Sequence, residues 1–105
     1  MPNDEVHAEI EKALAAAEPV AVATVAQTFG STPRKTGAKM LVRQDGSFVG
    51  TIGGGCGEAE VWQDAMAVLD GGAPRIVTVD LTEPVDGEDK ICGGIMRVFV
   101  ERLAR

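Results

Sequence analysis

Residues 20–28 read VAVATVAQT, and this apolar stretch decides the predicted fold. Its apolar side chains fall on both alternating faces, which is typical of an interior strand that is covered on both sides. Glu18-Pro19 precedes it, and a helix before it should end there because the residue before a proline is biased out of the helical region. We therefore expect residues 20–28 to form the centre of a sheet.

Two amphipathic helices are predicted around this strand. Residues 3–17 have apolar side chains at helical spacing, and Asn3 is placed to cap the helix. The second helix covers residues 58–69, and the glycines of Asp70-Gly71-Gly72 should end it. The expected buried stripes are Val6, Ile10, Ala13, Leu14 and Ala17 in the first helix, and Ala59, Trp62, Ala65, Met66 and Leu69 in the second.

The remaining apolar runs are predicted strands. Residues 38–43 and 48–52 flank Gln44-Asp45-Gly46-Ser47, and Asp-Gly between two apolar runs indicates a β-hairpin. Residues 75–81 and 95–103 should add two further strands, separated by an acidic surface loop. The predicted class is α/β leaning to α+β, with one mixed sheet of about five strands and two main helices packed against it.

Composition limits the kind of protein this can be. The chain has 105 residues, of which 45% are hydrophobic, so we expect one domain over residues 1–105. A formal net charge of −6 argues against nucleic acid as a partner. The sequence has no run of about 18 apolar residues and starts with acidic residues, so we expect no membrane span or signal peptide and a cytoplasmic protein.

The first candidate site is the glycine run Gly53, Gly54, Gly55, Cys56 and Gly57. Its flexible backbone leads into a helix N-terminus, where free N–H groups favour an anion and lower the pKa of a thiol. Cys56 is thus a candidate soft ligand or nucleophile, and Glu58 could orient a ligand beside it. In the alternative interpretation the glycines only form a tight turn. The spacing matches neither a dinucleotide fingerprint nor a P-loop.

The second candidate site groups hydroxyls and cations in an acidic chain. It contains Ser31, Thr32, Arg34 and Lys35. These side chains suit a phosphate or a carboxylate. A solvated turn whose charges have no ligand is the alternative.

The third candidate site is Cys92-Gly93-Gly94, a second thiol beside a second glycine pair. In a reducing compartment Cys56 and Cys92 are expected to be free thiols, and the sequence does not place them near each other. Zinc is disfavoured because Cys56, Cys92 and His7 supply at most three ligands. His7 is given no role.

Three motifs in a fixed order resemble the amino-terminal domain of the XdhC/CoxI family over nearly the whole chain. They are FGSTPR at 29–34 with GAKM at 37–40, GTIGGGC at 50–56 with Glu58, and ICGG at 91–94. The resemblance implies binding of molybdenum cofactor (molybdopterin), a pterin dithiolene with a phosphate. It also implies delivery to an apo molybdenum hydroxylase, such as xanthine dehydrogenase or aerobic carbon monoxide dehydrogenase, without turnover by the chain itself.

The resemblance also implies site residues and partners. Arg34, Lys35 and the glycine loop would hold the phosphate and pterin, and Cys56 would face the molybdenum. Some members work with a cysteine desulfurase, and many carry a second, Rossmann-like domain that we do not find here, so we expect a Rossmann-domain partner or a homodimer. Two alternatives stay open: a small sulfur-transfer or redox enzyme that uses Cys56 with Cys92, and a purely structural protein within a larger complex.

Overall fold

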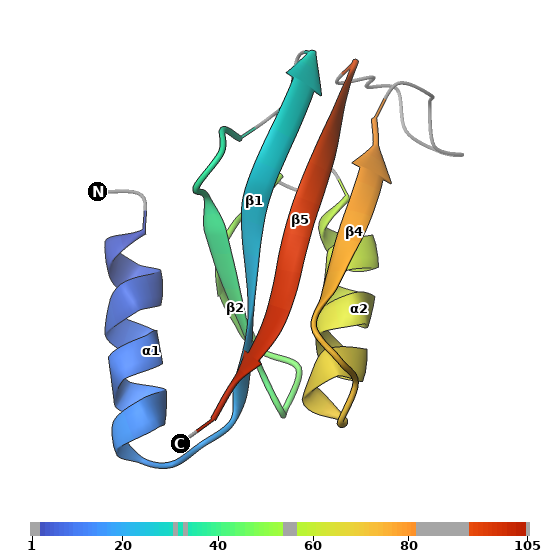
Figure 1. The fold of residues 1–105 in the computed structure, drawn as a ribbon. Helices are drawn as coiled ribbons and strands as arrows, with labels where there is room; N and C mark the ends of the chain where they lie inside the picture. Colours follow the sequence, from blue (N-terminus) through green and yellow to red (C-terminus); the bar gives the residue numbers. More distant parts are fainter. Residues whose placement is uncertain (1–2, 31, 33, 54–56, 82–92, 105) are drawn as a thin grey trace.

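The computed structural model describes residues 3–30, 32, 34–53, 57–81 and 93–104. Two helices and five strands follow one another along these residues (Figure 1). Their order is α1 (Asp4–Ala15), β1 (Val20–Gly30), β2 (Lys39–Arg43), β3 (Phe48–Gly50), α2 (Glu58–Leu69), β4 (Arg75–Asp80) and β5 (Gly94–Leu103). The helices and strands expected from the sequence are therefore confirmed.

The strands form a single sheet in the order β3-β2-β1-β5-β4. β1 lies at its centre, as its apolar pattern on both faces predicted (Figure 1). All four pairings are antiparallel, so the α+β class is confirmed and the sheet is antiparallel rather than mixed. The physical reason is that α2, which could serve as a crossover for parallel strands, joins the two edge strands β3 and β4, and these do not pair.

One face of the sheet packs against α2 around small and branched side chains. β1 contributes Ala21, Ala23 and Val25, whose small size lets the helix lie close to the sheet. In α2 the buried residues are Val61, Ala65, Val68 and Leu69. The predicted stripe was therefore right at Ala65 and Leu69. It was wrong at Ala59, which is exposed, and only partly right at Trp62 and Met66, which are half-buried.

The other face is only partly covered, because α1 packs against the half formed by β2 and β3. Val6 and Ala13 are buried there with Val20 and Leu41, and Ile10 packs against them. Ala17 was expected in this stripe but is exposed and has a positive φ of 55°, beyond the end of the helix.

Two polar contacts fix α1 to the sheet. The guanidinium of Arg43 donates to the carboxylate of Glu9 at 2.6 Å, and this hydrogen bond lowers the pKa of Glu9. The side chain of Asn3 does not cap α1 as predicted. Instead its amide nitrogen donates to the carbonyl of Gly37 at 2.7 Å, and its oxygen accepts from the N–H of Lys39 at 3.2 Å. Asn3 thus connects α1 to the polar loop.

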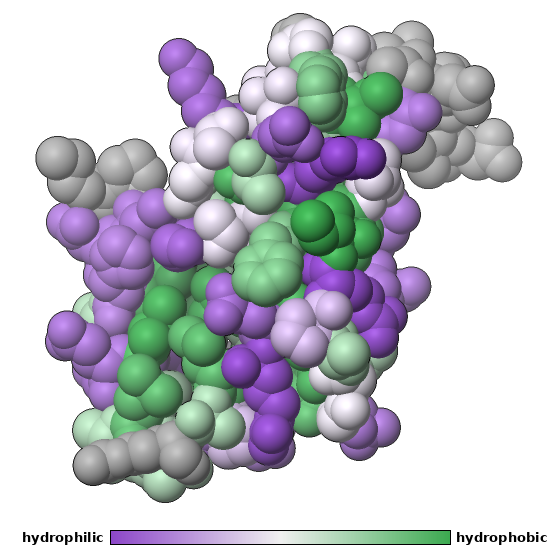
Figure 2. Space-filling view, in the orientation of Figure 1, coloured by the Kyte–Doolittle hydropathy of each residue, from purple (hydrophilic) through white to green (hydrophobic). Residues whose placement is uncertain are grey.

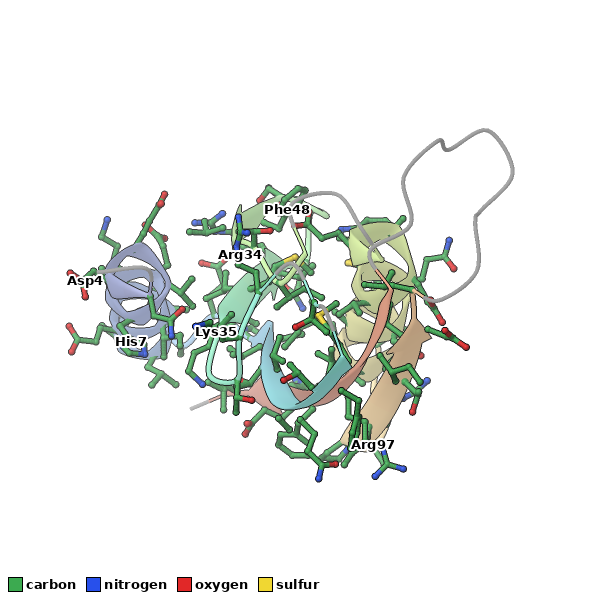
Figure 3. All side chains as sticks on the ribbon, turned by 90° about the horizontal axis from the view of Figure 1, so that it is seen from above. Asp4, His7, Arg34, Lys35, Phe48 and Arg97 are labelled. Atoms are coloured by element: carbon green, nitrogen blue, oxygen red, sulfur yellow. The ribbon has the colours of Figure 1, made fainter. Side chains whose placement is uncertain are left out.

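Beyond α1, the face formed by β1, β5 and β4 is open. Phe29 is 50% exposed and Ile76 is 60% exposed there, and Figure 2 shows apolar side chains beside polar ones on this face. Arg97 projects on the same side, and its guanidinium donates to Gln27 at 3.4 Å (Figure 3). No described helix has the length and apolar character needed to cross a membrane.

Candidate functional site

The antiparallel sheet brings the three sequence motifs to one of its ends. β1, β3 and β4 end there and β5 begins there, as does α2 (Figure 1). Gly30, in the first motif, pairs with Gly94 in the third. Gly30 has a φ of +73°, and a Cβ at this position would lie 3.1 Å from the carbonyl oxygen of Gly93. A glycine at position 30 therefore allows the first and third motifs to approach closely.

The second and third motifs meet at Leu81. The N–H of Gly93 donates to the carbonyl of Leu81 at 2.9 Å, and the N–H of Leu81 donates to Gly94 at 2.8 Å. Gly57, which ends the glycine run, has a φ of +76°, and a Cβ there would collide with Val79 and lie 3.8 Å from Leu81 Cδ2. The N-terminus of α2 therefore packs directly on the last residues of β4.

The polar loop borders a cavity at the same end of the sheet. The cavity has a volume of about 530 Å³ and is lined by Thr28, Gly30, Thr32, Lys35 and Thr36. Thr32 donates to the carbonyl of Arg34 at 2.9 Å, and the N–H of Ala38 donates to the carbonyl of Lys35 at 3.2 Å, so two hydrogen bonds shape the loop. Figure 3 looks down on this end and shows Arg34 and Lys35 on the loop that crosses it.

The charge of Lys35 is available in this cavity. Its side chain is exposed, and it takes part in no ion pair among the residues that the structure describes. An ammonium group beside several threonine hydroxyls is suited to a phosphate or another oxyanion. The cavity can thus hold an anion without displacing an existing partner of Lys35.

Glu58 joins the end of the hairpin to the start of α2. Its carboxylate accepts a short hydrogen bond from the hydroxyl of Thr51, and that hydroxyl oxygen accepts from the N–H of Gly53 at 3.3 Å. These contacts fix the direction of the Glu58 carboxylate next to the glycine run. The sequence predicted Glu58 but missed Thr51, although a hydroxyl just before the glycine run was a signal that could have found it.

A second cavity, of about 440 Å³, lies between the β2–β3 hairpin and the beginning of α2. The described residues that line it are Met40, Gly46, Phe48, Glu58, Ala59 and Trp62. None of these except Glu58 was a predicted site residue. Sequence reasoning placed Trp62 in the helix core, since aromatic residues at helical spacing are usually buried.

Seven of the predicted site residues are described, and all of them lie at this end of the sheet: Thr32, Arg34, Lys35, Gly53, Glu58, Gly93 and Gly94. Ser31, Gly54, Gly55, Cys56 and Cys92 lie outside the described residues, so their roles stay predictions. Over the described ranges, no three residues of His, Cys, Asp or Glu are grouped as metal ligands.

Comparisons with known proteins agree on one family. The model of the XdhC and CoxI family matches residues 13–80. YqeB of Escherichia coli K12 is 42% identical over 85 residues, 78% of this chain and 15% of that protein. A probable xanthine dehydrogenase component of Bacillus subtilis 168 is 32% identical over 102 residues, 94% of this chain and 31% of that protein.

Two further matches carry informative names. The molybdenum cofactor insertion chaperone PaoD of Escherichia coli K12 is 28% identical over 92 residues, 88% of this chain and 29% of that protein. A crystal structure described as a xanthine dehydrogenase from Bacillus halodurans has a TM-score of 0.78 and 32% identity, over 97% of this chain and 30% of that one. The chain therefore spans less than a third of the length of each of these proteins.

Proposed function

This chain belongs to the XdhC and CoxI family, as its motifs predicted, and we propose that it binds molybdenum cofactor and delivers it to an apo molybdenum hydroxylase. A relative named as a molybdenum cofactor insertion chaperone and relatives named as xanthine dehydrogenase components support an accessory role connected with this cofactor. The client would be of the xanthine dehydrogenase or aerobic carbon monoxide dehydrogenase type. The chain itself would perform no turnover.

The observation that carries the proposal is the meeting of three sequence-distant motifs at one end of the sheet. Gly30 pairs with Gly94, and Gly57 neighbours Leu81, which is hydrogen-bonded to Gly93. Glycines at such contacts leave the backbone accessible to a ligand. A purely structural protein would not need a cation and hydroxyls beside these glycines.

The described side chains fit the cofactor's phosphate. Lys35 and Thr32 face a cavity of about 530 Å³, and the N-terminus of α2 offers further N–H donors and the positive end of a helix dipole. When bound, the cofactor supplies the molybdenum and its dithiolene. The residues of the chain would hold the phosphate, orient the cofactor and limit its contact with water.

The roles of the two cysteines belong to this proposal as well. Cys56 and Cys92 precede Gly57 and Gly93, and both of these glycines neighbour Leu81. This supports one shared site, with Cys56 as a soft ligand facing the molybdenum. The alternative, a sulfur-transfer or redox protein, predicts a thiol that alkylates well below the ordinary cysteine pKa of about 8.5.

The open sheet face supports a polypeptide partner. The relatives are more than three times as long as this chain, so in them the same fold is joined to additional polypeptide. We propose that the equivalent of that polypeptide, a Rossmann-like domain on a separate chain, covers Phe29 and Ile76 in a cytoplasmic complex. A homodimer and an association with a cysteine desulfurase are the other outcomes that a binding test would separate.

The direct test is retention of molybdenum cofactor by the purified chain, followed as pterin fluorescence after gel filtration. Wild type should retain the cofactor, and Lys35→Ala and Cys56→Ala should each retain less. Lys12→Ala is the matched control, because it removes the same charge from α1, where Lys12 pairs with Glu9 at 3.3 Å. Equal retention by Lys35→Ala and Lys12→Ala would remove the polar cavity from the site, and no retention by wild type would overturn the proposal.

A further inference from the structure

A groove with aromatic walls adjoins the candidate site. It is the cavity of about 440 Å³ between the β2–β3 hairpin and the beginning of α2. Phe48 and Met40 line it from the hairpin, and Trp62 and Ala59 line it from α2. Glu58 is its one charged described residue, and it stands next to Gly57 at the end of the glycine run.

The indole ring of Trp62 is held in a fixed position in this groove. Its N–H donates to the carbonyl of Gly46 at 2.9 Å, so the ring's one polar atom is satisfied. Gly46 makes the approach possible, since a Cβ at this position would lie 3.3 Å from Cζ2 of Trp62. Trp62 is also only half-buried, although it packs against the core. A satisfied, immobile and partly exposed aromatic ring is a suitable surface for stacking.

Phe48 supplies the second aromatic surface. It is 52% exposed, whereas Val42, its partner on β2, is fully buried on the same side of the sheet. Figure 3 shows Phe48 on the side of the sheet that carries α2, opposite Arg97. A large apolar side chain left half open beside a groove gains from a ligand that covers it.

Glu58 gives the groove a chemical preference. An ionised carboxylate has only acceptor atoms, and the hydrogen bond from Thr51 fixes its orientation. A ligand that enters the groove must therefore present N–H or O–H donors to Glu58, because covering an unpaired carboxylate with an apolar group is costly. An aliphatic chain does not meet this requirement, and a flat nitrogen heterocycle with an N–H edge does.

We propose that this groove is the pterin subsite, in which the ring stacks on Phe48 and Trp62 and its amino-pyrimidine edge donates to Glu58. The inference rests on the proposed function, because it assigns part of the same cofactor to residues that neither the motifs nor the comparisons single out. It separates the ring-binding residues from the phosphate-binding residues Thr32 and Lys35.

The test uses free pterin (2-amino-4-oxopteridine), which carries neither metal nor phosphate. Trp62 is the only tryptophan, so ¹H–¹⁵N spectra contain one indole signal, and that signal should shift as pterin is added. Lumazine has a carbonyl in place of the 2-amino group and should bind roughly tenfold more weakly, because one donor to Glu58 is replaced by an acceptor.

Two variants and their matched controls locate the ligand. Glu58→Gln should remove the preference for pterin over lumazine, whereas Glu60→Gln, in the same helical turn but outside the groove, should keep it. Phe48→Ala should weaken both ligands about fivefold to tenfold. Phe29→Ala should leave both unchanged, since Phe29 is equally exposed, at 50%, but belongs to β1 outside the groove.

The outcomes distinguish this inference from the proposed function. An unshifted indole signal, or equal binding of pterin and lumazine by wild type, would overturn the pterin subsite. If wild type, Phe48→Ala and Glu58→Gln all retained intact cofactor equally in gel filtration, the proposed function would stand and the groove assignment would fail. If wild type retained no cofactor but bound pterin with the stated preference, the proposed function would fail and the groove would remain a pterin site.

Discussion

Replacing Gly57 with alanine should strongly destabilise the protein and disturb the candidate site. Gly57 precedes the first residue of α2 and has a φ of +76°, which costs an L-residue about 1–2 kcal/mol. In addition, the new Cβ would collide with Cγ1 of Val79, which is only 1% exposed. Overpacking of this kind costs roughly 1–3 kcal/mol, so the expected loss is about 2–5 kcal/mol.

Gly71, at the opposite end of the same helix, provides the matched control. Its φ is +101°, so alanine there bears at least a comparable backbone cost, but a Cβ would meet nothing within 4 Å. Gly71→Ala should therefore cost only about 1–2 kcal/mol. Urea unfolding of both variants, followed by the fluorescence of Trp62, measures the difference in the free energy of unfolding.

A double-mutant cycle tests the cause of that difference. If the collision with Val79 is responsible, Val79→Ala should cost less in the Gly57→Ala background than in wild type. Equal destabilisation by Gly57→Ala and Gly71→Ala, together with additivity of Gly57→Ala and Val79→Ala, would refute the tight packing of the α2 N-terminus on β4. The architecture of the candidate site would then need revision.

Three other predictions follow from the fold. Gly50→Ala should lower the unfolding midpoint by more than Gly71→Ala, because its Cβ would lie 2.5 Å from both the carbonyl oxygen of Lys39 and a methyl group of Val6; thermal unfolding by circular dichroism measures this. The hydrogen bond from Arg43 lowers the pKa of Glu9 below its unfolded value of 4.5, so the bond's contribution to stability is present above pH 4.5 and lost as the pH falls through the lowered value. The difference in urea midpoint between wild type and Glu9→Gln should accordingly be present at pH 7 and disappear in acid, and a difference that persists in acid would contradict this. Ile76→Ser, on the open face, should change the free energy of unfolding by less than about 0.5 kcal/mol but reduce any association with a partner or a second copy, as measured by sedimentation velocity.

The sequence predicted those features that depend on local pattern. β1 was placed at the centre of the sheet because its apolar residues occupy both faces, and Asp45-Gly46 predicted the hairpin. In the structure Gly46 has a φ of +88°, and the Asp45 carboxylate accepts from both the N–H and the hydroxyl of Ser47, which lowers the pKa of Asp45. Local backbone chemistry was sufficient for these elements.

Features that depend on long-range contacts could not be predicted in this way. Asn3 is a good cap by residue type, but its amide is used by Gly37 and by Lys39, which is 36 positions away. The buried side of α2 was only partly predicted because the helix has apolar residues on more than one side, and the small residues of β1 select among them. The aromatic groove depends on Phe48 and Trp62 from separate elements, so no sequence spacing could indicate it.

The placement of charge explains how an acidic chain could bind an anionic cofactor. The formal net charge is −6, but exposed charges act mainly within a Debye length of about 8–10 Å. Lys12 and Arg43 are paired with Glu9 away from the glycine end, and Arg75 is paired with Asp64. Lys35 lines the polar cavity and has no such acidic partner among the described residues. Since Lys35→Ala and Lys12→Ala change the net charge equally, any difference between them in cofactor retention measures the local arrangement at the candidate site and not the overall charge.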